Sequence, residues 1–340
     1  MRYKLLGRSG LRVSELALGT MTFGQDWGWG CSQDEAKAMF DVFAQAGGNF
    51  IDTANRYTNG TSEQYVGEFI AVDRDHWVVA TKYTLFDRHG DPSFSGNHRK
   101  NMVRSLESSL RRLKTDHIDL FWVHAWDFLT PVDEVMRGLD DLVRAGKVLY
   151  VGISDTPAWV VAQANTLAEL RGWSPFVALQ IRYSLADRAA ERDLLPMARA
   201  FDLAVTPWSI LGAGVLTGKY SGGGTVKGRA SRWHKDERHL AIGDAVVEVA
   251  EAIGRSPSQV AINWVRQQPG LIIPLLGASS LAQLQDNLAA LDFTLAPEQL
   301  HRLNEASKID LGFPHDFLHG DEVRNLVTGG TFHQVDNHRR

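Results

Sequence analysis

The chain alternates short, almost continuous apolar runs with segments of helical periodicity. The apolar runs, each predicted to form a strand, are 15–20, 49–52, 77–82, 118–124, 148–154, 176–180, 203–208 and 271–277. The clearest predicted helices are 34–47, 99–114 and 131–146. Strands that are apolar on both faces are typical of a parallel sheet covered by helices, and eight is the number that closes a barrel.

The sequence therefore predicts an α/β fold, a (β/α)8 TIM barrel. A doubly wound open sheet is the alternative. It is disfavoured because "LGTMTFG" at 18–24 does not match the G-x-G-x-x-G pattern that follows the first strand of a dinucleotide-binding sheet.

Three segments depart from the repeating pattern. The N-terminal 16 residues predict a hairpin that turns at 8–10 and closes the bottom of the barrel. Residues 217–240 predict a long loop after the seventh strand, and the chain from about 308 to 340 predicts a terminal tail. Because no segment has the composition of a linker, we expect 1–340 to form a single domain.

Composition excludes several classes of function. The net charge of −4 argues against a nucleic-acid partner, and the single cysteine, Cys31, rules out an internal disulfide or a cysteine-built metal site. The histidines show no metal-binding spacing, so no metal is expected. No run of 18 apolar residues suggests a membrane span, and charges and glycines interrupt the N-terminus. We expect a cytoplasmic protein with no membrane partner.

Ionisable side chains stand where the predicted strands end. Asp52 ends the second strand and Tyr57 follows it, Lys82 ends the third and His124 ends the fourth. Such ends meet on the functional face of a barrel. There a lysine ammonium would lower the pKa of the tyrosine, Asp52 would orient Lys82, and His124 would hydrogen-bond a substrate carbonyl. This set favours carbonyl reduction with Tyr57 as general acid.

The stretches "DTANRY", "ATKY" and "FWVHAWD" resemble the aldo-keto reductases, and the likeness extends over about residues 3 to 291. It is strongest to the aryl-alcohol dehydrogenase type and to the β subunits of voltage-gated potassium channels. The resemblance implies a catalytic tetrad of Asp52, Tyr57, Lys82 and His124.

The resemblance also implies a nicotinamide cofactor. Ser154 and Gln180 would bind the carboxamide and Trp208 would stack on the ring, although Asp155 stands where an asparagine is common. The cofactor-binding residues expected in full are Thr20, Met21, Asp52, Ser154, Gln180, Trp208, Ser209, Leu211, Gly212, Lys219, Arg229, Gly277, Ser279, Gln283, Asp286 and Asn287. Gly277 and Gln283 replace the Lys and Arg of many relatives, as in the channel subunits, and NADP(H) is favoured over NAD(H).

Aromatic residues in the loops predict where the substrate binds. Trp27, Phe86 and Trp126 are the candidates for contact with a small-molecule carbonyl compound. Two other functions compete: a Schiff-base aldolase with Lys82 as nucleophile, and an NADP(H)-binding redox sensor with little turnover. Assembly into a homo-oligomer stays open.

Overall fold

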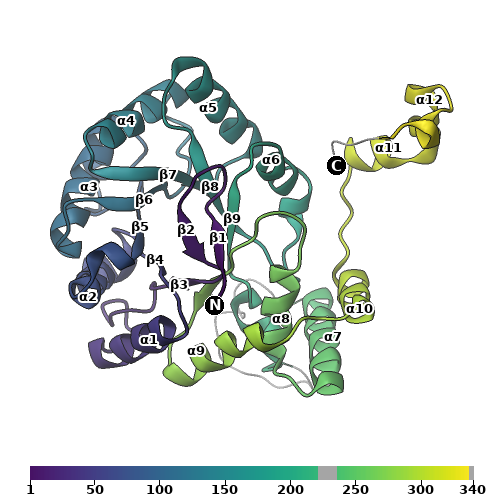
Figure 1. Ribbon diagram of the computed structural model, residues 1–340, viewed down its shortest axis with the longest axis horizontal. Helices are drawn as coiled ribbons and strands as arrows, with labels where there is room; N and C mark the ends of the chain where they lie inside the picture. The colour runs from purple at the N-terminus through teal and green to yellow at the C-terminus, as the bar shows by residue number, and fades with distance from the viewer. Residues whose placement is uncertain (221–235, 337–340) are drawn as a thin grey trace.

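The computed structural model describes residues 1–220 and 236–336. Eight parallel strands form one sheet, in the order β10-β3-β4-β5-β6-β7-β8-β9. The strands are β3 (Ala17–Gly19), β4 (Phe50–Asp52), β5 (Val78–Tyr83), β6 (Ile118–Val123), β7 (Val148–Ser154), β8 (Phe176–Arg182), β9 (Ala204–Trp208) and β10 (Leu275–Gly277). A parallel bridge between Val205 and Ile272 brings the two ends of the sheet together, which confirms the predicted barrel (Figure 1).

Helices surround this barrel (Figure 1). They are α1 (Gln33–Gln45), α2 (Thr61–Ile70), α3 (Arg99–Leu113), α4 (Val132–Arg144), α5 (Ala158–Arg171), α6 (Leu194–Ala200), α7 (Glu237–Ile253), α8 (Pro257–Arg266), α9 (Leu281–Leu288) and α10 (Pro297–Ser307). α1 begins with a capping box between Ser32 and Glu35, which satisfies free N–H groups of the first turn. The three predicted helices match α1, α3 and α4 to within two residues at each end.

Two predicted strands are shorter than expected. β3 covers only Ala17–Gly19 of 15–20, and β10 covers only Leu275–Gly277 of 271–277. β10 begins only after Pro274 because proline has no N–H to donate to a neighbouring strand. α7 also begins inside the predicted loop 217–240, and the central part of that loop lies outside the described residues.

Side chains alternate along each strand between the barrel interior and the surrounding helices. The interior is a small cluster that includes Phe50, Ala80, Leu120, Trp122 and Ala178. The neighbouring residues Ile51, Val79, Phe121, Val123 and Leu179 belong to the larger cluster beneath the helices. Because the period is two, the residue two positions after an interior residue also points inward.

The N-terminal hairpin closes one end of the barrel, as the sequence predicted. β1 (Tyr3–Leu5) and β2 (Arg12–Ser14) pair antiparallel, and Leu6 and Val13 are fully buried in the interior cluster. Gly7 has a φ of +58°, and a Cβ there would lie 2.1 Å from the carbonyl oxygen of Val177. This turn therefore requires glycine.

The C-terminal segment is more ordered than the predicted tail. It forms the short helices α11 (His315–His319) and α12 (Asp321–Thr328), which lie away from the barrel (Figure 1). Neither helix contains a buried residue. Across the residues that the structure describes, no helix combines the length and the apolar character needed to span a membrane.

Candidate active site

The predicted strand-end residues converge on one end of the barrel because of the alternation just described. Asp52 comes two residues after the interior Phe50, Lys82 two after Ala80, and Gln180 two after Ala178. Ser154 and His124 stand at the same level on their own strands: Ser154 pairs in register with Gln180, and His124 directly follows β6. All come from adjacent parallel strands, so their side chains meet at the carboxyl end of the sheet.

An ion pair between Lys82 and Asp52 is the centre of this cluster. Lys82 Nζ donates to Asp52 Oδ2 and, at 2.7 Å, to the carbonyl oxygen of Thr53. Gln180 Nε2 donates to the other carboxylate oxygen, Asp52 Oδ1, at 3.0 Å. Both carboxylate oxygens are therefore paired, which is the condition for a buried ion pair to be stable.

Tyr57 lies above this ion pair on the loop that follows β4. Lys82 Nζ is 4.8 Å from the centroid of its ring. The ring of His124 meets that of Tyr57 edge-on, at 5.9 Å between centroids and an angle of 82°. The loop turns sharply after Tyr57, since both Thr58 and Asn59 have positive φ angles. The four residues of the expected tetrad are thus in one cluster.

The acidity of Tyr57 differs from the sequence-based expectation. We expected the ammonium of Lys82 to lower the pKa of the phenol. The lysine acts in that direction, but burial of the ring and the carboxylate of Asp52 act against it, and on balance the pKa of Tyr57 is raised above 10.0. Burial also lowers the pKa of Lys82, yet Asp52 and Tyr57 outweigh it and raise that pKa above 10.5. Lys82 stays charged and Tyr57 stays protonated near neutral pH.

His124 is neutral. Burial, followed by the charge of Lys82, holds the pKa of His124 well below 6.5. Within the described part of the chain, its buried ring nitrogen Nδ1 has no hydrogen-bond partner. A buried polar atom without a partner is uncommon, and a catalytic role is one of the explanations for it.

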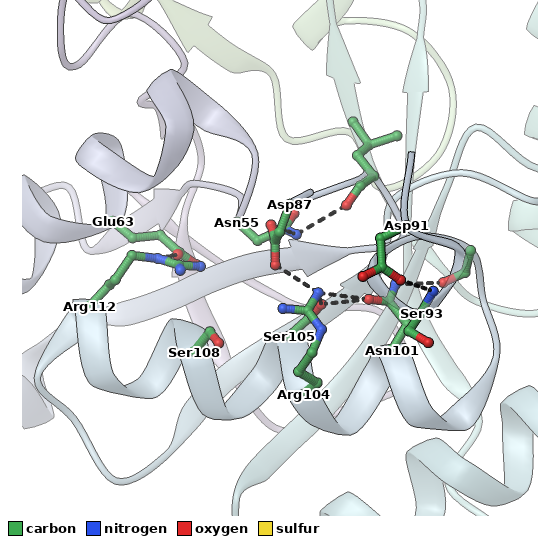
Figure 2. Close-up of polar contacts among 12 residues, drawn as sticks. Asn55, Glu63, Asp87, Asp91, Ser93, Asn101, Arg104, Ser105, Ser108 and Arg112 are labelled. Atoms are coloured by element: carbon green, nitrogen blue, oxygen red, sulfur yellow. Dashed lines mark hydrogen bonds and ion pairs between the residues drawn. The ribbon is translucent and has the colours of Figure 1, made fainter. Parts of the chain in front are cut away.

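A network that the sequence did not predict fixes the loop of Tyr57. Asn55 Nδ2 donates to the carbonyl oxygen of Leu85 at 3.2 Å and to Asp87 Oδ1 at 2.8 Å. Asp87 in turn accepts from Arg104 Nη2 at 2.8 Å, and Figure 2 shows this chain of contacts reaching α3. "DTANRY" contains Asn55, but nothing in the sequence identifies Asp87 as its partner.

The residues expected around the nicotinamide lie on the next strands of the barrel. Ser154 and Gln180 are buried and paired in register at the ends of β7 and β8. Trp208 ends β9, partly exposed, and its ring N–H donates to Asp155 Oδ1 at 3.1 Å. Asp155, which replaces the common asparagine, therefore orients the tryptophan.

The residues expected along the rest of the cofactor fall into three groups. Ser209, Leu211 and Gly212 form the turn after β9, in which Ser209 and Gly212 have positive φ angles, and Lys219 is exposed beyond it. Arg229 lies outside the described residues. The second group directly follows β3: Thr20 is buried against the carbonyl oxygen of Asp52, and Met21 is partly exposed.

The third group lies just before α9 and along it. Gly277 is exposed, with open space where a Cβ would be, and the amino end of α9 favours an anion. Ser279 donates to Gln283 Oε1 at 2.9 Å from its N–H and at 3.0 Å from its hydroxyl. Asn287 is buried. These positions fit the expected adenosine end of a cofactor.

Asp286 has a structural partner in α8. Its carboxylate accepts from Ser256 Oγ at 2.8 Å and from Gln259 Nε2 at 2.7 Å. Both carboxylate oxygens of Asp286 therefore accept hydrogen bonds from side chains at the start of α8. The contact of Asp286 with a cofactor remains a prediction.

The expected substrate residues separate into two places. Trp27 and Phe86 both contact the side chain of Arg56, which directly precedes Tyr57. Trp126 is partly buried and packs against the core beneath the helices. Trp27 and Phe86 therefore belong to one cluster at the edge of the site.

Fold and site together define an eight-stranded α/β barrel with a buried Asp–Lys pair beside a tyrosine and a histidine. Residues 15–308 match the model of the aldo/keto reductase family. The chain belongs to this family.

Curated relatives agree with this assignment. The chain is 39% identical to norsolorinic acid reductase of Aspergillus flavus, over 96% of this chain and 86% of that protein. It is 40% identical to the NADP(+) aryl-alcohol dehydrogenase of Phanerodontia chrysosporium, over 92% and 87%. It is 37% identical to a putative aryl-alcohol dehydrogenase of Saccharomyces cerevisiae, over 94% and 90%. The protein is therefore an oxidoreductase.

Proposed function

We propose that the protein is a cytoplasmic NADPH-dependent reductase that converts aldehydes or ketones to alcohols, with Tyr57 as the general acid. The observation that carries the proposal is the position of Tyr57, between the ammonium of Lys82 and the ring of His124. A protonated phenol beside a fixed ammonium can give its proton to a carbonyl oxygen, because the lysine stabilises the phenolate that is left behind.

The chain's own residues would perform three tasks. Tyr57 holds the proton at its hydroxyl, and Lys82, kept charged by Asp52, stabilises the negative charge after transfer. His124 is neutral, so it can hydrogen-bond the carbonyl oxygen without competing as an acid. Ser154, Gln180 and Trp208 would hold the nicotinamide, which supplies the hydride when bound.

NADP(H) is preferred over NAD(H) in this proposal. The amino end of α9 offers backbone N–H groups and a favourable dipole to a 2′-phosphate. One curated relative, the aryl-alcohol dehydrogenase of Phanerodontia chrysosporium, carries NADP(+) in its name. Titration of the protein with NADPH and NADH, followed by fluorescence, tests the preference; equal affinity would contradict it.

The experiment that tests the activity is the loss of NADPH absorbance with a panel of aromatic and aliphatic aldehydes. We expect turnover with aromatic aldehydes, since Trp27 and Phe86 stand at the edge of the site. Tight NADPH binding without turnover on any carbonyl would instead support the alternative function of a redox sensor. The aldolase alternative is disfavoured because Asp52 keeps Lys82 charged, whereas Schiff-base formation needs a neutral amine.

A further inference from the structure

Arg56 contacts two aromatic rings at the edge of the site. Its guanidinium carbon is 4.6 Å from the ring centroid of Phe86 and 5.5 Å from that of Trp27. The three residues follow β4, β5 and β3, which are neighbouring strands, so they meet on the same side of the barrel mouth. Arg56 directly precedes Tyr57, the proposed acid.

The charge of Arg56 has no carboxylate partner among the described residues. Its Nη1 donates to the amide oxygen of Asn59, an acceptor that it shares with the ring N–H of Trp27 at 3.3 Å. Arg104, on the same side of the barrel, is by contrast paired with Asp87 at 2.8 Å. A guanidinium has five N–H donors, so most of those of Arg56 remain available.

The position of Arg56 is fixed by its neighbours. Asn55, just before it, donates to the carbonyl oxygen of Leu85 and to the carboxylate of Asp87, the two residues that flank Phe86 (Figure 2). These two hydrogen bonds hold the backbone of Arg56 against the loop that carries Phe86. A cation ordered before its ligand arrives loses less conformational entropy on binding.

We propose that Arg56 binds a carboxylate on an aromatic carbonyl substrate whose reactive carbon lies at Tyr57. This inference rests on the proposed reductase function. The ring contacts with Phe86 and Trp27 use no N–H donor of the guanidinium, and a guanidinium with free donors grips a carboxylate through two parallel hydrogen bonds. The same two rings provide apolar surface for the aromatic part of the substrate.

The test compares an acid with its neutral ester. One pair of substrates is 4-carboxybenzaldehyde and its methyl ester, methyl 4-formylbenzoate. The second pair is the corresponding 3-substituted acid and ester. Each substrate is reduced with NADPH by three proteins: the wild type, Arg56→Gln and Arg88→Gln. Arg88 is the matched control, because it also stacks on a ring, that of Phe94, but is already paired with Asp91 at 3.3 Å. Both variants remove one positive charge.

For at least one of the two acids, we expect kcat/KM to exceed that of its ester by roughly tenfold or more in the wild type and in Arg88→Gln. This is the size of effect that a hydrogen bond to a charged group produces. Arg56→Gln should bring that ratio close to one. An unchanged ratio in Arg56→Gln, or an equal loss in Arg88→Gln, would overturn the inference.

Direct binding separates this inference from the proposed function. Titration of the NADP+-loaded protein with 4-carboxybenzaldehyde can be followed by tryptophan fluorescence, since Trp27 contacts Arg56. Tenfold weaker binding to Arg56→Gln without any reduction by the wild type would reject the reductase function and retain the carboxylate site. Equal affinity in both proteins would reject the site.

Discussion

Lys82 and Asp52 form an ion pair that is closed off from solvent, with side-chain exposures of 0% and 1%. The two residues come from neighbouring strands, and Gln180 and the carbonyl oxygen of Thr53 complete their hydrogen bonding. The pair connects the stability of the barrel with the chemistry of the site, because the same ammonium lies against the ring of Tyr57.

Lys82→Met should therefore destabilise the protein, since it leaves the carboxylate of Asp52 buried without its counter-charge. We expect the free energy of unfolding in urea to fall by about 3–5 kcal/mol. The double variant Asp52→Asn/Lys82→Met should recover part of that loss, because it buries no unpaired charge. Additive losses in the double variant would show that the two charges are not coupled.

Tyr57→Phe removes the proposed proton donor and keeps the ring. We expect kcat/KM for aldehyde reduction to fall by about 10²–10⁴, with the Kd for NADPH nearly unchanged. Tyr83→Phe is the control, because this buried phenol donates to the carbonyl oxygen of Asn97 and faces the helices. Activity of Tyr57→Phe within a few-fold of wild type would exclude Tyr57 as the acid.

The raised pKa of Tyr57 predicts how the rate depends on pH. A phenol with a pKa above 10.0 stays protonated at neutral pH, so kcat/KM for reduction should be flat from about pH 6 to 9. Alcohol oxidation needs the deprotonated form and should accelerate as the pH rises over the same range. Pre-steady-state rates in both directions provide the measurement; a reduction rate that falls near pH 7 would conflict with this assignment.

His124 predicts a pH dependence of stability. Its folded pKa lies well below the ordinary 6.5, so below pH 6.5 the unfolded chain binds a proton that the folded protein does not. Stability is then lost as the pH falls through 6.5, by at most about 1.4 kcal/mol per pH unit from this group. His124→Gln lacks this contribution. The difference in unfolding free energy between wild type and variant should be constant above about pH 7.5 and should shift in favour of the variant below pH 6.5. A difference that stays constant over the whole range would contradict the lowered pKa of His124.

Asn55→Ala tests the network that fixes the Tyr57 loop. The variant leaves the carbonyl oxygen of Leu85 and one oxygen of Asp87 without this donor, and we expect a loss of about 1–3 kcal/mol in unfolding free energy. Asp87→Ala alone should also destabilise, and the double variant should lose less than the sum, because the shared hydrogen bond is counted once. Strict additivity would mean that the contact contributes nothing.

Much of the site could be predicted because parallel strands obey a simple rule. An apolar run that ends in a polar residue places that residue at the carboxyl end of the sheet, so Asp52, Lys82, His124, Ser154 and Gln180 were brought together by their positions along the chain alone. Some helix boundaries have local causes, such as the capping Ser32 before α1 and Gly146, with its positive φ, after α4.

Other features could not be predicted in this way. Gly60 is the capping residue of α2, and the hydroxyl of the nearby Ser62 donates to the carbonyl oxygen of Thr20. A local rule favours serine at a helix start, whereas packing between β3 and α2 places this one in the core. The α11 and α12 helices likewise form where weak periodicity predicted only a tail.

The sequence by itself determined which residues stand at the strand ends, and with them the barrel, the tetrad and the family. Only the tertiary structure decided their ionisation and their neighbours. The pKa of Tyr57 depends on the loss of solvent around the phenol in the folded protein, which outweighs the adjacent lysine. The contacts of Arg56 with Trp27 and Phe86 join three loops that are about 30 residues apart in the chain, a proximity that the side-by-side pairing of β3, β4 and β5 creates.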